Sequence, residues 1–151
     1  MKGPWPVADF DQVRRLRVLA AGISGARVAE RLIPAPFEQV WDIVADLENE
    51  LGTFEPDMRR VVVRQVGDRT EAWAQGRLGF RARFDVDLEP GWCWMQSRFL
   101  MIGIAAAPAP GGTLVAATGG IRVPGRAALL PVAALPANRR ALRRLAARAA
   151  G

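Results

Sequence analysis

Apolar and charged residues alternate strictly from Phe80 to Leu88, where arginines and aspartates separate the apolar positions. Because neighbouring side chains of a strand point to opposite faces, this pattern predicts a half-buried β-strand whose apolar face lies on the core. Turn pairs that contain glycine lie at 67–68, 90–91 and 111–112. They divide the sequence into further expected strands, at 29–33, 59–66, 71–76, 92–99 and 113–123. One more strand break is expected between Phe99 and Ala107, with Gly103 as the candidate.

Residues 29–46 predict a short strand, a Pro-Ala-Pro corner and an amphipathic helix. Pro36 suits the first helical position, where its missing N–H costs no hydrogen bond. The apolar residues that follow have the spacing of one buried helical face: Phe37, Val40, Trp41, Val44 and Ala45. We expect Trp41, in the middle of this face, to be buried and to hold the helix against the sheet.

Residues 1–25 predict an N-terminal helical extension, followed by a main domain at 26–151. Asp9 and Gln12 have the spacing of a capping box at a helix start. Four apolar residues then recur at helical spacing before Gly22: Phe10, Val13, Leu16 and Ala20. We expect a short helix that packs on the main domain; the alternative is a loosely held tail.

The end of the chain predicts a long amphipathic helix from Pro136 onward. Its apolar stripe consists of Leu142, Leu145, Ala146 and Ala149. The opposite arc carries Arg140, Arg143, Arg144 and Arg148. Such a helix lies with its apolar side on a sheet, so the whole pattern predicts an α+β fold.

This order of elements resembles the START/Bet v 1-like (SRPBCC) superfamily, the polyketide cyclase/dehydrase and lipid-transport proteins. The resemblance covers about residues 26–150 and rests on Ile33–Asp42 with Asp46, on Leu88–Trp92, and on Pro110–Thr113. It implies a helix-grip fold, in which a curved antiparallel sheet of about six to seven strands wraps around the C-terminal helix and leaves a pocket. Members of the superfamily include aromatic cyclases, lipid and hormone carriers and coenzyme Q-binding proteins. The N-terminal helix is an addition to that core.

The amino-acid composition limits the catalytic and metal-binding chemistry that the chain can carry out. The chain has no histidine, no tyrosine and a single cysteine, Cys93, which excludes a Ser-His-Asp triad, an imidazole base and a structural zinc site. We therefore expect no metal and no cofactor. Acid–base chemistry, if present, depends on Asp, Glu, Arg, Lys2 or bound water. Cys93, which has no histidine to activate it, is expected to be inert.

The charge and hydropathy of the chain bear on its partners. The net charge is +6, but the basic residues are scattered among fifteen carboxylates and all except Lys2 are arginine. This bias is typical of a GC-rich bacterial genome, and we expect no nucleic-acid partner. The lone cysteine and the absence of a long apolar segment predict a cytoplasmic protein without a membrane span. The apolar run after Arg17 is too short, and too soon broken by Gly22, for an export signal.

Candidate ligand contacts come from the aromatic and polar residues of the strands. Trp73, Trp92, Trp94 and Phe99 are candidate walls of a pocket, against the alternative of plain core packing. Gln75, Gln96 and Arg98 interrupt apolar strands and would orient a carbonyl or enolate if they point inward; pointing outward, they are ordinary solvent-facing residues. The predicted ligand-binding set is Trp73, Gln75, Phe80, Phe84, Trp94, Gln96, Arg98 and Leu142.

Three functions remain open from the sequence. The leading hypothesis is binding or sequestration of an apolar or aromatic small molecule in an internal pocket. The second is a polyketide-type aromatase/cyclase, favoured if polar side chains converge inside the cavity; the sequence does not decide whether the protein is an enzyme. The third is a macromolecular interaction module that uses the Arg-rich C-terminal helix. The oligomeric state also stays open, a homodimer included.

Overall fold

The computed structural model describes residues 11–55, 57–130 and 134–151. Within them, seven strands form one antiparallel sheet in the order β1-β7-β6-β5-β4-β3-β2. The strands are β1 (Ala29–Ile33), β2 (Met58–Val66), β3 (Arg69–Gly76), β4 (Arg81–Glu89), β5 (Trp92–Gln96), β6 (Leu100–Ala109) and β7 (Gly112–Ile121). A 3₁₀ turn, η1 (Arg77–Gly79), joins β3 to β4. The predicted α+β fold is confirmed.

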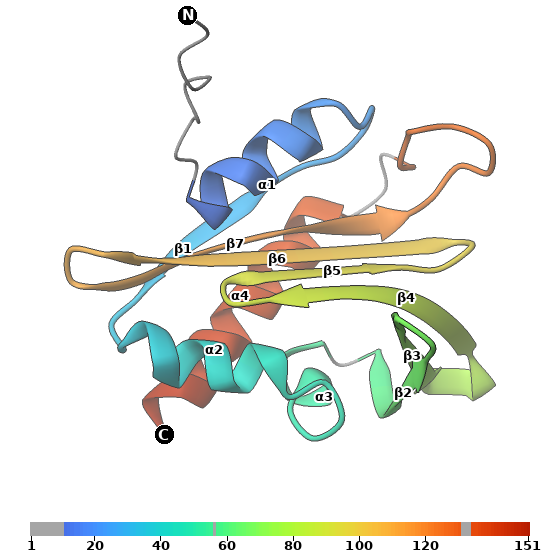
Figure 1. The fold of residues 1–151 in the computed structure, drawn as a ribbon. Helices are drawn as coiled ribbons and strands as arrows, with labels where there is room; N and C mark the ends of the chain where they lie inside the picture. The colour runs from blue at the N-terminus through green and yellow to red at the C-terminus, as the bar shows by residue number, and fades with distance from the viewer. Residues whose placement is uncertain (1–10, 56, 131–133) are drawn as a thin grey trace, which may run out of the picture.

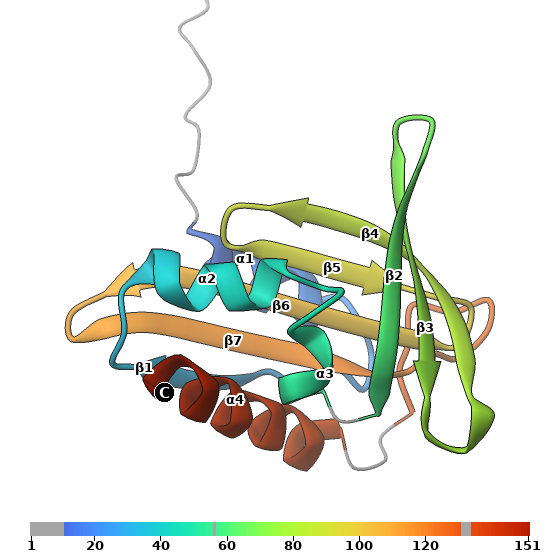
Figure 2. The ribbon, with the colours of Figure 1, turned by 90° about the horizontal axis from the view of Figure 1, so that it is seen from below.

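The helices lie on both faces of the sheet (Figures 1 and 2). They are α1 (Gln12–Ala21), α2 (Phe37–Ala45), α3 (Leu51–Phe54) and α4 (Ala134–Ala150). Helix α1 covers one face, which we call the outer face, over β6 and β7. Helices α2, α3 and α4 cover the opposite, inner face. In Figure 2 the β2–β3 hairpin runs across the direction of β5, β6 and β7, so the sheet curves around the inner helices.

Helix α1 docks through a small cluster of apolar residues separate from the main core. Val13 and Leu16 are buried against Trp92 and the outer-face alanines of β6 and β7. The N-cap is Asp11, whose side chain accepts a hydrogen bond of 2.8 Å from the backbone N–H of Arg14. The helix therefore begins two residues later than the capping box at Asp9 predicts. Asp9 and Phe10 lie outside the described residues.

The main core fills the space between the inner face and its helices. Trp41 is buried there, 8% exposed, and stacks on Phe37 with ring centroids 6.2 Å apart, as the helical spacing predicts. Pro36 lies one position before the helix, as its N-cap, rather than at the first helical position. On α4, Leu142, Leu145 and Ala149 are buried in this core.

The break between β5 and β6 differs from the predicted one. Strand β6 runs unbroken through Gly103, and the chain turns earlier, at residues 97–99. The Ser97 hydroxyl accepts hydrogen bonds from the N–H groups of Phe99 and Leu100, at 3.3 Å and 2.9 Å. A serine side chain thus makes a turn for which glycine was expected.

Strand β2 forms one edge of the sheet. At this edge the N–H of Val63 donates a hydrogen bond of 2.7 Å to the Glu48 side chain, which belongs to the segment between α2 and α3.

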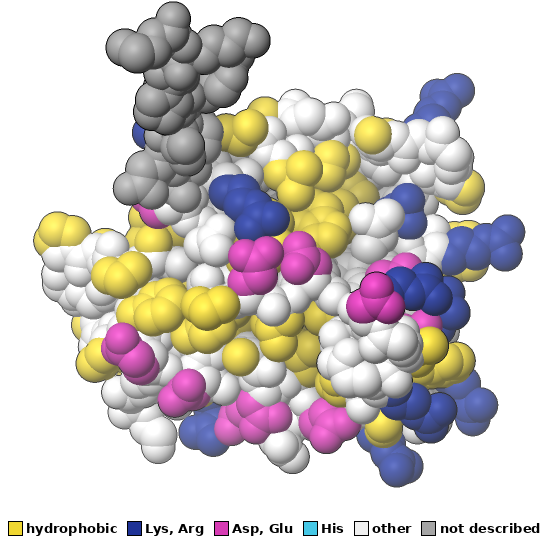
Figure 3. Space-filling view, in the orientation of Figure 1, with side chains coloured by type: hydrophobic (Ala, Val, Ile, Leu, Met, Phe, Trp, Pro, Cys, Tyr) yellow, Lys and Arg dark blue, Asp and Glu magenta, His cyan; other side chains and the backbone are white. Residues whose placement is uncertain are grey.

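Charged side chains are unevenly distributed over the face seen in Figure 3. Carboxylates gather along the lower border, where Figure 1 places α2 and α3. Arginine side chains gather at the end of the molecule formed by β2, β3 and β4. Folding therefore concentrates arginines that the sequence shows as scattered.

Candidate functional site

A cavity of about 590 Å³ lies on the inner face of the sheet, at the beginning of α4. Its walls come from five parts of the chain: the segment between α3 and β2, the 3₁₀ turn η1 with the start of β4, the first residues of β6, the last residues of β7, and α4. The apolar residues of its lining are Met58, Phe80, Leu100, Met101, Ile102, Ile121 and Ala137. The polar residues along its wall are Glu55, Asp57, Arg77, Thr118 and Asn138. Thr118 follows the core-facing Ala117, so its side chain points to the outer face.

The hollow exists because small residues stand where large side chains would fill it. Gly119 is the cross-strand partner of Ile102 in the β6–β7 ladder, so Ile102 meets no side chain opposite it. A Cβ at Gly119 would lie 2.6 Å from the Met101 carbonyl oxygen, and the tight backbone contact therefore requires glycine here. On the helix side the lining residue Ala137 offers only a methyl group.

The cavity lies at the end of α4 opposite to Ala146 and Ala149, the small residues of its apolar stripe. At that end, α2 packs against α4, and Val40, Trp41 and Val44 belong to the same buried core as Leu145. These larger side chains compensate for the alanines, so the remaining space opens near the first turn of the helix.

Among the titratable residues that line the cavity, Glu55 has a strongly raised pKa. Burial of its carboxyl raises its pKa to about 7, and the negative charge of Asp57 contributes in the same direction; Arg144 opposes them. Within the described part of the chain, this carboxyl has no hydrogen-bond or ion-pair partner. A carboxyl with a pKa near neutrality exists in both protonation states at physiological pH, so it can donate a proton to a ligand or accept one.

Two other polar residues of the cavity wall, Thr118 and Asn138, use their side chains in hydrogen bonds within the protein. The Thr118 hydroxyl donates a hydrogen bond of 2.8 Å to the carbonyl of Arg27, and the side-chain amide of Asn138 donates to the same oxygen at 3.4 Å. Both therefore fix the segment before β1 rather than present a free donor to the cavity. Glu55, Asp57 and Arg77 are left as the charged groups available to a ligand.

The structure places one member of the predicted ligand-binding set, Phe80, in the cavity wall. Phe84 is fully buried in the core, and Leu142 is buried on α4, next to a second hollow between that helix and β1. Neither lines the cavity, because core packing already surrounds both.

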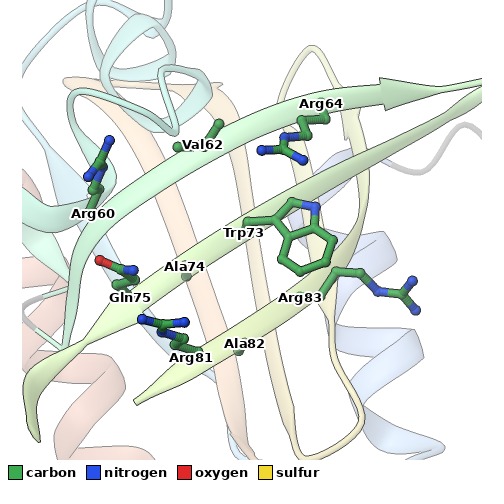
Figure 4. Close-up of a pocket in the computed structure, with 9 residues that line it drawn as sticks. All are labelled: Arg60, Val62, Arg64, Trp73, Ala74, Gln75, Arg81, Ala82 and Arg83. Carbon is green, nitrogen blue, oxygen red and sulfur yellow. The ribbon is translucent and has the colours of Figure 1, made fainter. Parts of the chain in front are cut away.

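Four other members of that set lie on the outer face, away from the cavity. The buried neighbours Ala72 and Ala74 face the core, and strand alternation therefore turns Trp73 and Gln75 outward (Figure 4). On β5 the buried neighbours Cys93 and Met95 do the same for Trp94 and Gln96. The indole N–H of Trp94 donates a hydrogen bond of 3.2 Å to the Gln96 side chain.

Arg98 is exposed in the turn between β5 and β6, its guanidinium carbon 5.4 Å from the centroid of the Phe99 ring. Trp92 and Phe99, the remaining candidate walls, do not line the cavity either: Trp92 packs under α1 and Phe99 is exposed in the same turn. No periodic pattern or motif in the sequence marks Glu55, Met58, Met101 or Thr118 as cavity residues. Glu55 belongs to a polar stretch without helical or strand periodicity, between the predicted helix that ends near Asp46 and the strand at 59–66.

Reactive groups are scarce in the described part of the chain. No cluster of three or more His, Cys, Asp or Glu residues there is placed to hold a metal ion. Cys93 is a free, buried thiol whose pKa burial raises to about 12, with a further contribution from Asp87; its thiolate is therefore scarce at neutral pH. Among the described helices, none has the length and hydropathy that crossing a membrane requires.

Solved structures share this architecture at low sequence identity. A protein from Mesorhizobium loti superposes with a TM-score of 0.61 and 17% identity, covering 81% of this chain and 94% of its own. A protein from Deinococcus radiodurans gives 0.58 and 21%, covering 82% and 95%. The di-domain ARO/CYC StfQ of the steffimycin biosynthetic pathway gives 0.61 and 10%, covering 91% of this chain and 54% of StfQ.

This is the helix-grip fold. Its curved antiparallel sheet, inner C-terminal helix and cavity between them agree with the START/Bet v 1-like resemblance, and α1 is added on the outer face. At these identities the similarity shows the fold alone. No protein-family model matches the sequence, and none of the curated proteins matches it. Within the helix-grip fold, function must therefore be argued from the cavity itself.

Proposed function

We propose that the protein binds an apolar or aromatic small molecule in the cavity at the beginning of α4. The observation that carries this proposal is a hollow of about 590 Å³ with a mainly apolar wall, within the range of about 300–1,000 Å³ usual for small-molecule sites. The ligand body would lie against Phe80, Leu100 and Ile102. Its polar end would meet Glu55, the lining carboxyl whose pKa lies near 7.

The uncharged fluorophore N-phenyl-1-naphthylamine tests this proposal. We expect saturable binding with enhanced fluorescence and a rise in melting temperature by mass action. Ala137→Trp should weaken binding at least tenfold, because Ala137 is exposed at the cavity and the added ring can enter it. Ala147→Trp, an equally large change at an exposed position near the other end of α4, is the matched control. Binding that does not saturate, or that both variants weaken equally, would refute the proposal.

A polyketide-type aromatase/cyclase is the second candidate, and Glu55 is the observation that favours it. Aldol closure of a poly-carbonyl chain needs a base that removes a proton from a methylene between two carbonyls; the resulting carbon nucleophile then attacks another carbonyl. A carboxyl with a pKa of about 7 is suited to this transfer and to returning the proton before water is lost. Cyclisation of a poly-carbonyl substrate should then be lost in Glu55→Gln, while N-phenyl-1-naphthylamine still binds. Equal cyclisation by this variant would exclude the role.

The third hypothesis, an interaction module on the Arg-rich face of α4, has less support. A filled interior and an uninterrupted positive surface would favour such a module. The interior holds a cavity instead, and Arg148 forms a two-point ion pair with Glu50, with nitrogen–oxygen distances of 2.9 Å and 2.7 Å.

A further inference from the structure

The outer face of β2, β3 and β4 surrounds one exposed tryptophan with four arginines (Figure 4). Arg60 and Arg64 come from β2, Arg81 and Arg83 from β4, and Trp73 from the strand between them. These residues line a shallow groove of about 430 Å³, separated from the inner-face cavity by the sheet itself. Trp73 is 46% exposed, so about half of its side-chain surface is available to a ligand.

Residues that pair across β2, β3 and β4 form rows that run across the groove. In the first row, Gln75 pairs with Arg60 on one side and with Arg81 on the other. In the second row, Trp73 pairs with Val62 and Arg83. Residues two positions apart on a strand are separated by roughly 6.6 Å, so the first row lies one such step from the tryptophan. Figure 4 shows Arg60, Gln75 and Arg81 together on one side of Trp73.

The carboxylates of these three strands lie on the other side of Trp73. Glu71 pairs across the strands with Arg64 and Asp85 in the third row, roughly 13 Å along the strands from Gln75. Glu71 is buried and forms an ion pair of 3.6 Å with Arg83. The Glu71 carboxylate therefore neutralises the positive charge of Arg83.

The first row therefore has an excess of positive charge. Within the described residues, Arg60 and Arg81 have no carboxylate at ion-pair distance. The guanidinium of Arg64 lies 5.7 Å from the centroid of the Trp73 ring and flanks the aromatic surface. A pair of arginines with an amide between them, one row from an exposed indole, combines an anion site with a stacking platform.

We propose that this groove binds a nucleoside phosphate, with the base stacked on Trp73 and the phosphate held by Arg60, Gln75 and Arg81. Guanidinium groups match phosphate oxygens with paired donors, and an indole is a stacking surface that accepts any base. The ribose spans the one-row step between base and phosphate. A free nucleotide and a nucleotide within single-stranded RNA present the same chemistry to the groove. This differs from the expectation drawn from scattered basic residues, because only the strand register brings these arginines together.

The test uses the full chain with adenosine monophosphate and, separately, with an RNA octamer of adenosine. Binding is followed by quenching of tryptophan fluorescence and by calorimetry. The double variant Arg60→Gln/Arg81→Gln should weaken both ligands at least tenfold. Trp73→Leu should weaken them about fivefold to one-hundredfold, as expected for the loss of one base–aromatic stack, and should remove most of the quenching.

The control is Arg140→Gln/Arg143→Gln, which removes the same charge from exposed positions on α4 and should leave both affinities unchanged. Unchanged N-phenyl-1-naphthylamine binding and melting temperature in each variant show that the fold is intact. Octamer affinity far above that of the mononucleotide, with a steep salt dependence, assigns the site to single-stranded RNA; comparable affinities assign it to free nucleotides.

Two results would overturn the proposal. If pyrophosphate displaces adenosine monophosphate as effectively as another nucleotide does, and Trp73→Leu has no effect on affinity, the groove binds anions without recognising a base. If the control double variant weakens binding as much as Arg60→Gln/Arg81→Gln, only the net charge of the protein matters.

Discussion

The ring of Trp94 lies directly on the backbone of Gly103, the residue paired with it on the neighbouring strand β6. A Cβ at Gly103 would be 2.8 Å from two carbons of that ring and 3.1 Å from the Thr118 methyl group. The ring is also held from its other sides, by stacking on Trp92 and by its hydrogen bond to Gln96. Gly103 therefore keeps space for an aromatic layer within the strand.

Gly103→Ala should lower the free energy of unfolding by roughly 1–3 kcal/mol, the usual cost of overpacking. Urea denaturation measures this loss, and near-UV circular dichroism should report a displaced tryptophan. Gly22→Ala is the control, since its Cβ would meet only the Leu19 carbonyl oxygen, at 3.5 Å. An alanine at 103 with wild-type stability would contradict the packing described above.

Trp41→Ala should lower the free energy of unfolding by about 3–5 kcal/mol, because a buried indole leaves a large void. The comparison is Trp73→Ala on the exposed outer face, where the loss should stay below about 1 kcal/mol. Both values come from chemical denaturation under the same conditions. Similar losses at the two sites would mean that Trp41 does not anchor α2.

Leu16→Ala should lower the free energy of unfolding by about 2–5 kcal/mol, because Leu16 is fully buried between α1 and the outer face. The matched control is Leu19→Ala on the same helix, where the side chain is 41% exposed. It should lower the free energy of unfolding much less. Thermal unfolding of the two variants decides the point. If they melt together at the wild-type temperature, α1 is not docked in solution.

The carboxyl of Glu55 should make stability depend on pH. Its pKa is about 7 in the folded chain, against an ordinary value of 4.5, so between these values the folded state binds more protons than the unfolded state. The stabilising contribution is complete below pH 4.5 and is lost as the pH rises to about 7. The loss is at most about 3.5 kcal/mol, since one pKa unit corresponds to about 1.4 kcal/mol.

Urea denaturation of wild type and Glu55→Gln across this pH range measures that contribution as a difference. The advantage of the glutamine variant should grow with pH and level off above neutrality. Asp57→Asn should move the midpoint to lower pH and Arg144→Gln to higher pH, because these residues respectively raise and lower the pKa of Glu55. A difference that is constant with pH would show that Glu55 is not perturbed.

Local periodicity was sufficient to predict most of the fold. The alternation from Phe80 to Leu88 fixes which residues of β4 face inward, and the helical spacing around Trp41 fixes the buried side of α2. Both patterns depend on neighbours in sequence. The errors lie at boundaries, where chemically similar residues compete: Asp11 rather than Asp9 caps α1, and Ser97 makes the turn expected at Gly103.

The candidate site was less predictable, because its walls come from five separate segments. On β3, alanine and tryptophan alternate, and both residue types are apolar, so the sequence around Trp73 does not distinguish the inner from the outer face. Similarly, the environment of Glu55 depends on Asp57 nearby and on Arg144 from the far end of the chain. Only the tertiary structure brings these charges together.

The hydrogen bond from Val63 to Glu48 has a consequence for the behaviour of the protein at high concentration. Val61, Val62 and Val63 form a β-prone run on an open strand edge, the kind of segment that pairs with a second copy of itself. The Glu48 carboxylate occupies an N–H group that such a copy would need, and the arginines that flank the run repel it. Glu48→Ala should consequently increase light scattering on storage while the melting temperature changes little. This carboxylate therefore protects the solubility of the folded molecule.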